Sequence, residues 1–384
     1  MKKAALNFAR IFVGVLFIFS GLIKANDPLG FGYKLEEYFD VFHLSFLNDS
    51  ATGIAILLCV LEIVLGALLL FGFWSKQVAK GLLLLIIFFT FLTFVSAFFK
   101  VVTSCGCFGD AIPLTPWQSF SKDLILLVLI TYIFIYKEQI RPISSNSTLQ
   151  KGLSIGVFAA SLLFGIYTYS FLPILDFLPY KVGVSLPAQM KIPEGATPDE
   201  FLIMYKLKNK KTAAQKEMSD KDYLKTEIWK DENWEIVGTP EKKLVKLGYQ
   251  PKIKDLFITD ASGTDYTKEL IENPYYSILI VAYNLKDVNE KAVAELNALA
   301  VNATDHFNIR TVLLTSSSAK DADAFTKKMK LATEVFYADA VPLKSMVRAN
   351  PGVVLLKNGV VINKWHYNAV PSFDDLAKRY FGKL

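Results

Sequence analysis

Five long apolar runs in the first half of the 384-residue chain limit what it can fold into. Each run is close to the ~20 residues that an α-helix needs to cross the ~30 Å hydrocarbon core of a bilayer. The runs cover residues 6–23, 51–73, 78–99, 120–136 and 152–175. We expect five transmembrane helices. The first should be retained rather than cleaved as a signal peptide, because Ile23-Lys24-Ala25 is a poor cleavage site.

Charged residues concentrate after the last apolar run, so the two parts of the chain suit different solvents. We expect a transmembrane helical bundle over 1–179, a linker with a small α+β segment over 180–250, and a soluble domain over 251–384. The net charge of +6 is mild. No basic stripe is interleaved with aromatic residues, which argues against nucleic-acid binding.

The charges of the loops predict the orientation. The amino-terminal segment and the loops at 76–80 and 137–151 carry eight Lys or Arg against one acid, Glu138. The alternate loops are rich in acids, namely Asp27, Glu36, Glu37, Asp40, Asp49 and Asp110. Because basic loops stay in the cytoplasm, we expect a multi-pass protein of a bacterial inner membrane, embedded in the lipid bilayer. Its amino terminus should be cytoplasmic and its carboxy-terminal domain periplasmic.

The loop between the third and fourth runs contains Cys105-Gly106-Cys107, on the side where disulfides persist. A disulfide needs Cα atoms roughly 4.4–6.8 Å apart, so the backbone would have to fold over Gly106. Such a small ring should be strained, and strained, exposed disulfides tend to be labile or catalytic. This spacing favours a redox pair.

Two other interpretations of the cysteines stay open. A static local disulfide would close almost no loop and would therefore stabilise little. A metal site would need more ligands, and the three histidines are not well placed for one, so we expect no metal. Cys59 lies deep in the second run, where a lone thiol is typically a packing residue.

Two acids lie within the apolar runs. A charged group near the middle of a bilayer costs ~2.5–3.5 kcal/mol on insertion scales. Glu62 should therefore face the interior of the bundle. Asp123 should lie near the outer boundary, beside the cysteine loop or paired with Lys122 or Lys24. Proton handling and a structural polar contact both remain interpretations of these acids.

Several of these features together resemble the DoxX/MauE family of membrane proteins over residues 1–136. The matching features are Gly21-Leu22-Ile23-Lys24 before Asp27-Pro28, Glu62 before Gly66 and Gly72, and Cys105-Gly106-Cys107-Phe108-Gly109 before Asp123. The resemblance implies a four-helix bundle similar to vitamin K epoxide reductase-like bundles, here with a fifth helix. MauE-type proteins are associated with maturation of disulfide-containing periplasmic enzymes, and DoxX-type proteins with quinol oxidase complexes. The paired cysteines favour the MauE side.

The soluble part alternates between strand and helix patterns. Residues 201–209 and 213–218 predict a hairpin, followed by a short helix capped by Ser219. The later elements are expected as strand 277–283, helix 289–306, strand 309–315, helix 320–330, strand 335–338, a short helix to 349, two strands around Asn358-Gly359, and helix 372–380. This order resembles the thioredoxin fold of the peroxiredoxin and TlpA-like kind over about 250–384. Pro351 stands where that fold carries its cis-proline.

The domain departs from this fold at the position where redox-active members carry their cysteines. A Cys-x-x-Cys motif is expected after the first central strand, but residues 283–289 contain no cysteine, and none follows Cys107. Without a thiolate the domain cannot exchange disulfides itself. Tyr283, Asn350 and Pro351 are therefore candidate residues for binding a client or partner. Purely structural support is the alternative.

These observations favour an integral membrane protein that supports extracytoplasmic thiol–disulfide chemistry. Cys105 and Cys107 would be its redox pair, and Glu62 and Asp123 its polar or proton-handling partners. A quinone is the candidate cofactor, and periplasmic clients or membrane-complex subunits are the candidate partners. The alternative is a non-catalytic scaffold subunit of an envelope or quinol oxidase complex.

Overall fold

The computed structural model describes the chain except residues 1, 103–105, 107, 199, 247 and 383–384. It consists of two compact units. One combines Met1–Val184 with Phe257–Leu384, and the other is Ser185–Leu256. The cysteine pair expected to be redox-active lies outside the described residues.

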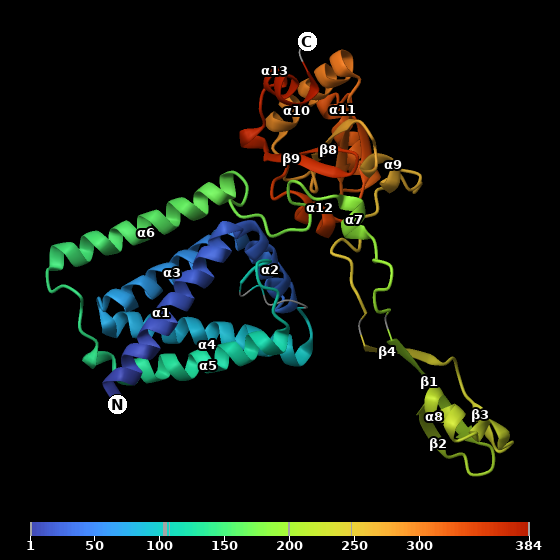
Figure 1. The fold of residues 1–384 in the computed structure, drawn as a ribbon, viewed down its shortest axis with the longest axis horizontal. Helices are drawn as coiled ribbons and strands as arrows, with labels where there is room; N and C mark the ends of the chain where they lie inside the picture. Colours follow the sequence, from blue (N-terminus) through green and yellow to red (C-terminus); the bar gives the residue numbers. More distant parts are fainter. Residues whose placement is uncertain (1, 103–105, 107, 199, 247, 383–384) are drawn as a thin grey trace. The chain divides into compact units, whose positions relative to one another are not determined.

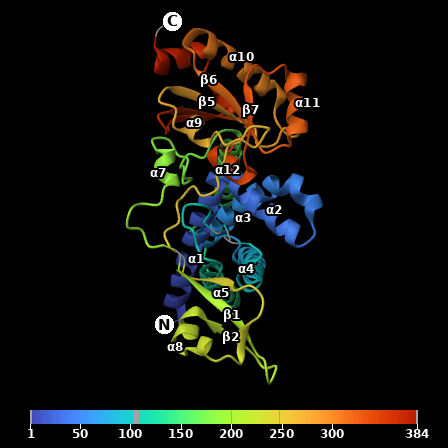
Figure 2. The same cartoon turned by 90° about the vertical axis from the view of Figure 1, so that its right-hand side faces the viewer.

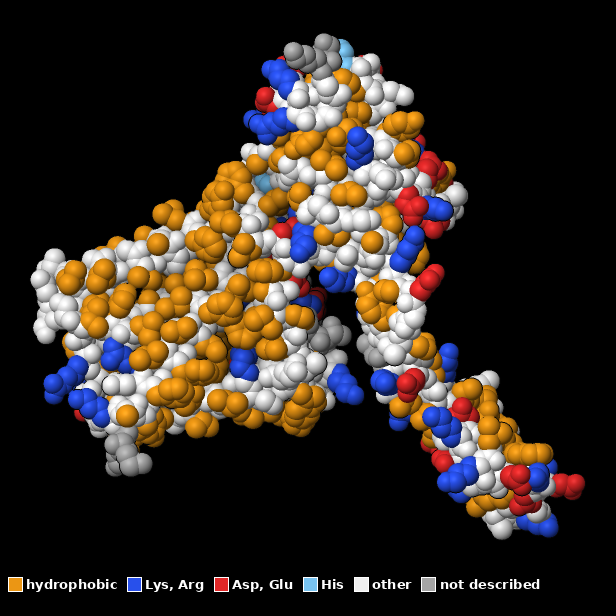
Figure 3. Space-filling model, in the orientation of Figure 1, with side chains coloured by type: hydrophobic (Ala, Val, Ile, Leu, Met, Phe, Trp, Pro, Cys, Tyr) orange, Lys and Arg blue, Asp and Glu red, His pale blue; other side chains and the backbone are white. Residues whose placement is uncertain are grey.

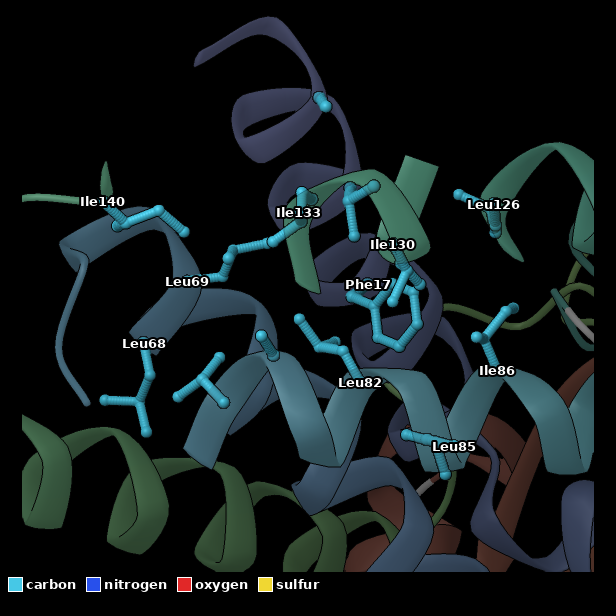
Figure 4. Packing of buried hydrophobic residues seen from close by; sticks show 14 of the residues in the cluster. Phe17, Leu68, Leu69, Leu82, Leu85, Ile86, Leu126, Ile130, Ile133 and Ile140 are labelled. Carbon is cyan, nitrogen blue, oxygen red and sulfur yellow. The ribbon is translucent and has the colours of Figure 1, made fainter. Parts of the chain in front are cut away.

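Five helices of the first unit are long and apolar enough to cross a membrane, which confirms the expectation of a multi-pass protein. They are α1 (Lys2–Asn26), α3 (Ala51–Phe71), α4 (Ser75–Phe99), α5 (Pro116–Ile135) and α6 (Ser147–Ser170). They pack largely through leucine, isoleucine and phenylalanine side chains. Figure 4 shows Phe17, Leu82 and Ile130 converging from three of them. Hydrophobic side chains also cover the visible outer face of the bundle, as expected of helices surrounded by lipid (Figure 3).

Helix α2 (Pro28–Val41) occupies the acid-rich segment after the first span, which we expected to be a loop. Its start has a local cause. Asp27 caps the helix by accepting a hydrogen bond from the Gly30 amide, and Pro28 fits the first turn. Phe31, Leu35 and Tyr38 recur at helical spacing, and all three are buried. The cap and this spacing are the sequence signals that identify the helix.

The second unit contains a four-stranded antiparallel sheet in which β1 pairs with β2, β3 and β4. Its elements are α7 (Leu186–Met190), β1 (Glu200–Asn209), β2 (Gln215–Ser219), α8 (Asp220–Lys225), β3 (Trp234–Ile236) and β4 (Glu241–Lys246). The expected hairpin is therefore confirmed as β1 and β2. Ser219 caps α8 by accepting a hydrogen bond from the Asp222 amide, as its position predicted.

Residues 257–384 of the first unit form a five-stranded sheet with the order β7-β6-β5-β8-β9 (Figures 1 and 2). The elements are α9 (Thr267–Ile271), β5 (Tyr276–Val281), α10 (Glu290–Phe307), β6 (Arg310–Thr315), α11 (Ala319–Met329), β7 (Glu334–Tyr337), α12 (Ala340–Met346), β8 (Gly352–Lys357), β9 (Val360–His366) and α13 (Phe373–Leu376), which continues as a π-helix over Ala377–Phe381. Strands β5, β6 and β7 run parallel, whereas β8 and β9 are antiparallel to their neighbours. The predicted elements are thus confirmed to within a few residues.

Burial on both faces explains why the central strands read as continuous apolar runs. Ile278 and Ile280 of β5 pack with α10, α11 and α13 in one cluster. Leu279 and Val281 point to the opposite face and are also fully buried. Asn358 and Gly359 have φ angles of 50° and 75°, the left-handed pair that a tight hairpin turn requires between β8 and β9.

Candidate functional site

The described part of the cysteine loop lies beside helix α2. Gly106 has a φ of 65°, in the left-handed region that glycine adopts at little cost. A Cβ atom added to Gly106 would lie 3.3 Å from Cγ of Lys34 on α2. The helix that we did not expect from the sequence is therefore the immediate neighbour of this loop.

A cavity of about 410 Å³ adjoins the loop. Its wall includes Lys24 at the end of α1, one side of α2, and Gly106, Gly109 and Asp110. Residues 173–178 and the end of α12 complete it. The cavity is thus bounded both by the membrane-spanning part of the unit and by the domain that follows it.

Arg348, just beyond α12, links these elements although it is only 5% exposed. Its Nε donates to Oδ1 and Oδ2 of Asp27 at 3.1 and 2.8 Å. Its Nη2 donates to Oδ2 of Asp110 at 3.1 Å, and its Nη1 donates to the Lys344 carbonyl at 2.6 Å. Burial lowers the pKa of Arg348, but Asp27 and Asp110 more than offset this, so the pKa is raised. The guanidinium therefore stays charged and holds the start of α2 and the end of the cysteine loop together.

Two acids that line the cavity have raised pKa values. Burial raises the pKa of Asp110 above its usual value, although Arg348 and Lys34 act in the opposite direction. Burial likewise raises the pKa of Glu36, which lies 3.5 Å from Nζ of Lys344. These carboxyl groups are consequently easier to protonate than free side chains.

Three residues predicted as a binding face of the soluble domain meet where β5 and β8 are adjacent. The Asn350–Pro351 peptide bond is cis, as the position of Pro351 predicted. Asn350 donates from its side-chain amide to the Asn284 carbonyl at 2.8 Å. Tyr283 accepts a hydrogen bond of 3.0 Å from the hydroxyl of Tyr33, on α2. The part of the face around Tyr283 thus contacts the membrane-spanning region of the same chain.

Three residues at the cavity were not expected from the sequence to be functional, namely Tyr33, Lys344 and Arg348. Nζ of Lys344 lies 4.0 Å from the centre of the Tyr33 ring, a cation–π contact. Burial, followed by the neighbouring Tyr283, raises the pKa of Tyr33 well above its usual value, so that its hydroxyl remains a donor. Arg348 is 321 residues from Asp27 and 238 from Asp110, and no local pattern could reveal such pairs.

The two acids predicted inside the bundle are both buried, at 1% exposure. Glu62 faces the interior as expected and forms an ion pair with Lys24. Asp123 pairs with Lys122, one of the two partners considered, and accepts a hydrogen bond of 3.0 Å from Thr93. Both acids line one small pocket of about 30 Å³ among α1 to α5. Cys59, on α3 with Glu62, is a buried packing residue.

Within the described ranges, no group of three or more His, Cys, Asp or Glu side chains is arranged to hold a metal ion. The polar groups at the cavity include Asp27 and Asp110, which are paired with Arg348, and Glu36, which is paired with Lys344. Such a set can orient a loop and bind a polar chain segment.

Comparison with known families identifies the membrane-spanning part. The family described as methylamine utilisation protein MauE matches residues 2–136. Residues 2–136 are a MauE-family membrane region. The MauE-type region thus comprises α1 to α5, whereas α6 lies outside the match. Protein TlpB of Flavobacterium psychrophilum is 31% identical over 128 residues, which are 33% of this chain and 35% of that protein. The match therefore spans about a third of this relative.

Solved structures with partial similarity include a secreted disulfide oxidoreductase of Mycobacterium tuberculosis. It is 14% identical, with a TM-score of 0.26, over 32% of this chain and 92% of that one. The bacterioferritin comigratory protein of Xanthomonas campestris, whose structures concern alkyl peroxide reduction, is 15% identical with a TM-score of 0.24, over 32% and 85%. The strand order of residues 257–384 itself defines a thioredoxin-like domain. Its core order is β6-β5-β8-β9, with β8 antiparallel to β5 and the cis-proline before β8.

Proposed function

We propose that the protein is a membrane-embedded thiol–disulfide redox protein in which Cys105 and Cys107 interconvert between two thiols and a disulfide. Formation of the S–S bond releases two electrons and two protons. Two electrons and two protons pass to a disulfide of a partner protein, which is reduced to two thiols. The observation that carries the proposal is the cavity bordered by Gly106 and Gly109, beside which Arg348 holds Asp110.

The thioredoxin-like domain has a supporting role in this proposal. No cysteine follows Cys107, so the domain has no thiolate with which to attack a disulfide. Asn350 and Pro351 are its candidate residues for a client or partner, whereas Tyr283 contacts Tyr33 of α2. Glu62 and Asp123 are the polar partners of the redox chemistry within the bundle.

The pocket lined by Glu62 and Asp123 is one place to look for a binding site of the candidate quinone. Its volume of about 30 Å³ corresponds to roughly two water molecules. The proposal therefore sends the electrons to a protein disulfide and routes no step through a quinone.

The proposal places the amino terminus in the cytoplasm and the thioredoxin-like domain in the periplasm of a bacterial inner membrane. The basic loops support this orientation. An odd number of spans puts the two ends of the membrane-spanning part on opposite sides. The cysteine loop, between α4 and α5, then shares a compartment with the domain.

The decisive experiment measures the thiol state of Cys105 and Cys107 in intact membranes. Mass-shift alkylation across defined redox buffers is carried out in a Cys59→Ser background, with Cys105→Ser as the matched control. We expect a reversible two-electron transition between roughly −120 and −270 mV, which Cys105→Ser abolishes. A disulfide that stays oxidised well below about −300 mV, or thiols that never oxidise, would contradict the proposal. Either result would favour the scaffold function.

A further inference from the structure

The two buried acids of the MauE-type region differ in how their oxygens are satisfied. Both oxygens of Asp123 have partners, since Oδ1 contacts Lys122 and Oδ2 accepts from Thr93. Glu62 uses only Oε1, which accepts from Lys24. Its Oε2 is buried and has no hydrogen-bond partner among the residues that the structure describes. The two acids, for which the sequence left the same two interpretations open, are therefore not equivalent in the fold.

An unsatisfied buried carboxylate oxygen is costly, because it has lost its hydrogen bonds to water and gained none in the fold. Glu62 lines the pocket of about 30 Å³. A water molecule needs roughly 10–15 Å³ of such space and two or more polar partners. The pocket has room for about two waters, and the Glu62, Lys24, Lys122 and Asp123 side chains supply the partners.

The pocket also adjoins the larger cavity. Lys24 and Phe31 line both. Lys24 is the charged one of the two, with Glu62 on the pocket side and Asp27 and Gly106 on the cavity side. Its ammonium group lies 5.0 and 4.7 Å from the ring centres of Phe31 and Phe89. Lys24 thus places a charged group between the pocket and the cavity, next to the aromatic rings of Phe31 and Phe89.

We propose that this pocket is a hydrated proton site in which Glu62, and not Asp123, takes up and releases the proton. A hydronium ion among the pocket waters transfers its proton to Oε2 of Glu62 and becomes water, and the reverse transfer regenerates the carboxylate. Exchange with the outer cavity passes Lys24. The inference deepens the proposed function and rests on it for its purpose, since each exchange removes two protons from the cysteine thiols before two are returned to the partner's thiols.

The surroundings define which groups can compete for the proton. The titratable side chains that line the pocket with Glu62 are Lys24 on α1, Tyr38 on α2, and Lys122 and Asp123 on α5. Helix α4 lines it only with Ile86, Phe89 and Leu92. Cys59 lies beside Glu62 on α3. Asp123 is the competing carboxyl group, and this makes it the matched control.

The test is infrared difference spectroscopy of the full chain in lipid nanodiscs between acidic and alkaline buffer, in H₂O and D₂O. We expect a protonated-carboxyl band that shifts in D₂O, is lost in Glu62→Gln and remains in Asp123→Asn. Glu62→Asp keeps a carboxyl group and should move the band without removing it. Size-exclusion profiles and helical content confirm that each variant is folded.

Two outcomes would overturn the inference. One is a band that survives in Glu62→Gln, and the other is a band that disappears in Asp123→Asn. The readout does not use the cysteines. An inert cysteine pair with a Glu62 band would refute the proposed function alone, whereas a reversible cysteine pair without a Glu62 band would refute the proton site alone.

Discussion

The MauE-type region and the thioredoxin-like domain both bury charged side chains, but they pair them differently. Lys24 and Glu62, and likewise Lys122 and Asp123, are pairs within the MauE-type region. The buried cations of the domain, Arg348 and Lys364, contact acids outside it. Arg348 binds Asp27 and Asp110, and Nζ of Lys364 lies 2.6 Å from Oδ2 of Asp176, in the segment after α6.

This difference indicates what each region contributes. A buried pair within one region leaves that region self-sufficient, whereas a buried cation whose partner lies elsewhere fixes two regions together. The domain keeps the strand order and cis-proline of its fold but has no cysteine, and its buried cations serve attachment. Under the proposed function, the chemistry belongs to the loop of the membrane-spanning part and the domain holds that loop in place.

The largest expected effect tests whether the domain has a core of its own. Leu279→Ala removes a fully buried side chain from β5. It should lower the free energy of unfolding of the domain by about 3–4 kcal/mol, because a cavity replaces the lost packing. Calorimetry and far-UV circular dichroism of the full chain in detergent should show the domain transition moving while the bundle transition stays. Val301→Ala, at a site 39% exposed, is the control. Equal shifts of both transitions would contradict separate cores.

The next effect is a pH dependence confined to the domain. Burial lowers the pKa of His366 to about 4, from an ordinary 6.5, and its Nδ1 accepts a hydrogen bond from the Asn368 amide. The folded state thus favours neutral histidine. Its contribution is complete above about pH 6.5 and is lost as the pH falls towards about 4. The loss should reach roughly 3 kcal/mol. Urea unfolding at both ends of this range measures it.

Two variants check the assignment to this histidine. His366→Gln should flatten the acid dependence of the domain, whereas His306→Gln, at an exposed histidine, should leave it unchanged. An acid transition that persists unaltered in His366→Gln would show that another group is responsible.

The smallest of these effects tests the attachment itself. Arg348→Ala leaves Asp27 and Asp110 without their shared cation and should cost about 2 kcal/mol. This is less than the 3–5 kcal/mol of a fully buried pair, because Asp110 is half exposed. A double-mutant cycle of Arg348→Ala with Asp27→Asn, followed by thermal unfolding, measures the coupling.

Lys344→Gln is the matched control for this cycle. It removes the ion pair with Glu36 and the cation–π contact with Tyr33. The Lys344 and Glu36 side chains are 26% and 28% exposed, so stability should change by no more than about 1 kcal/mol. Equal effects of Arg348→Ala and Lys344→Gln would show that Arg348 has no special role in the attachment.

Local patterns predicted most of the fold. A membrane span needs about 20 apolar residues in succession, and all five runs are helices in the structure. The helix N-caps are also local signals, since Asn289 caps α10 and Ser219 caps α8. Helix α2 was missed because it is short and carries three acids, although Asp27-Pro28 marks its start.

The sequence by itself determined the five membrane spans, the β/α order of the thioredoxin-like domain and the absence of a thiol there. Each depends on neighbours within about 20 residues, where periodicity and capping act. Only the tertiary structure decided that Arg348 joins Asp27 to Asp110 and that Asp123 is saturated while Glu62 is not. These are contacts between distant segments, and hydrogen-bond satisfaction depends on where side-chain atoms meet in the folded chain.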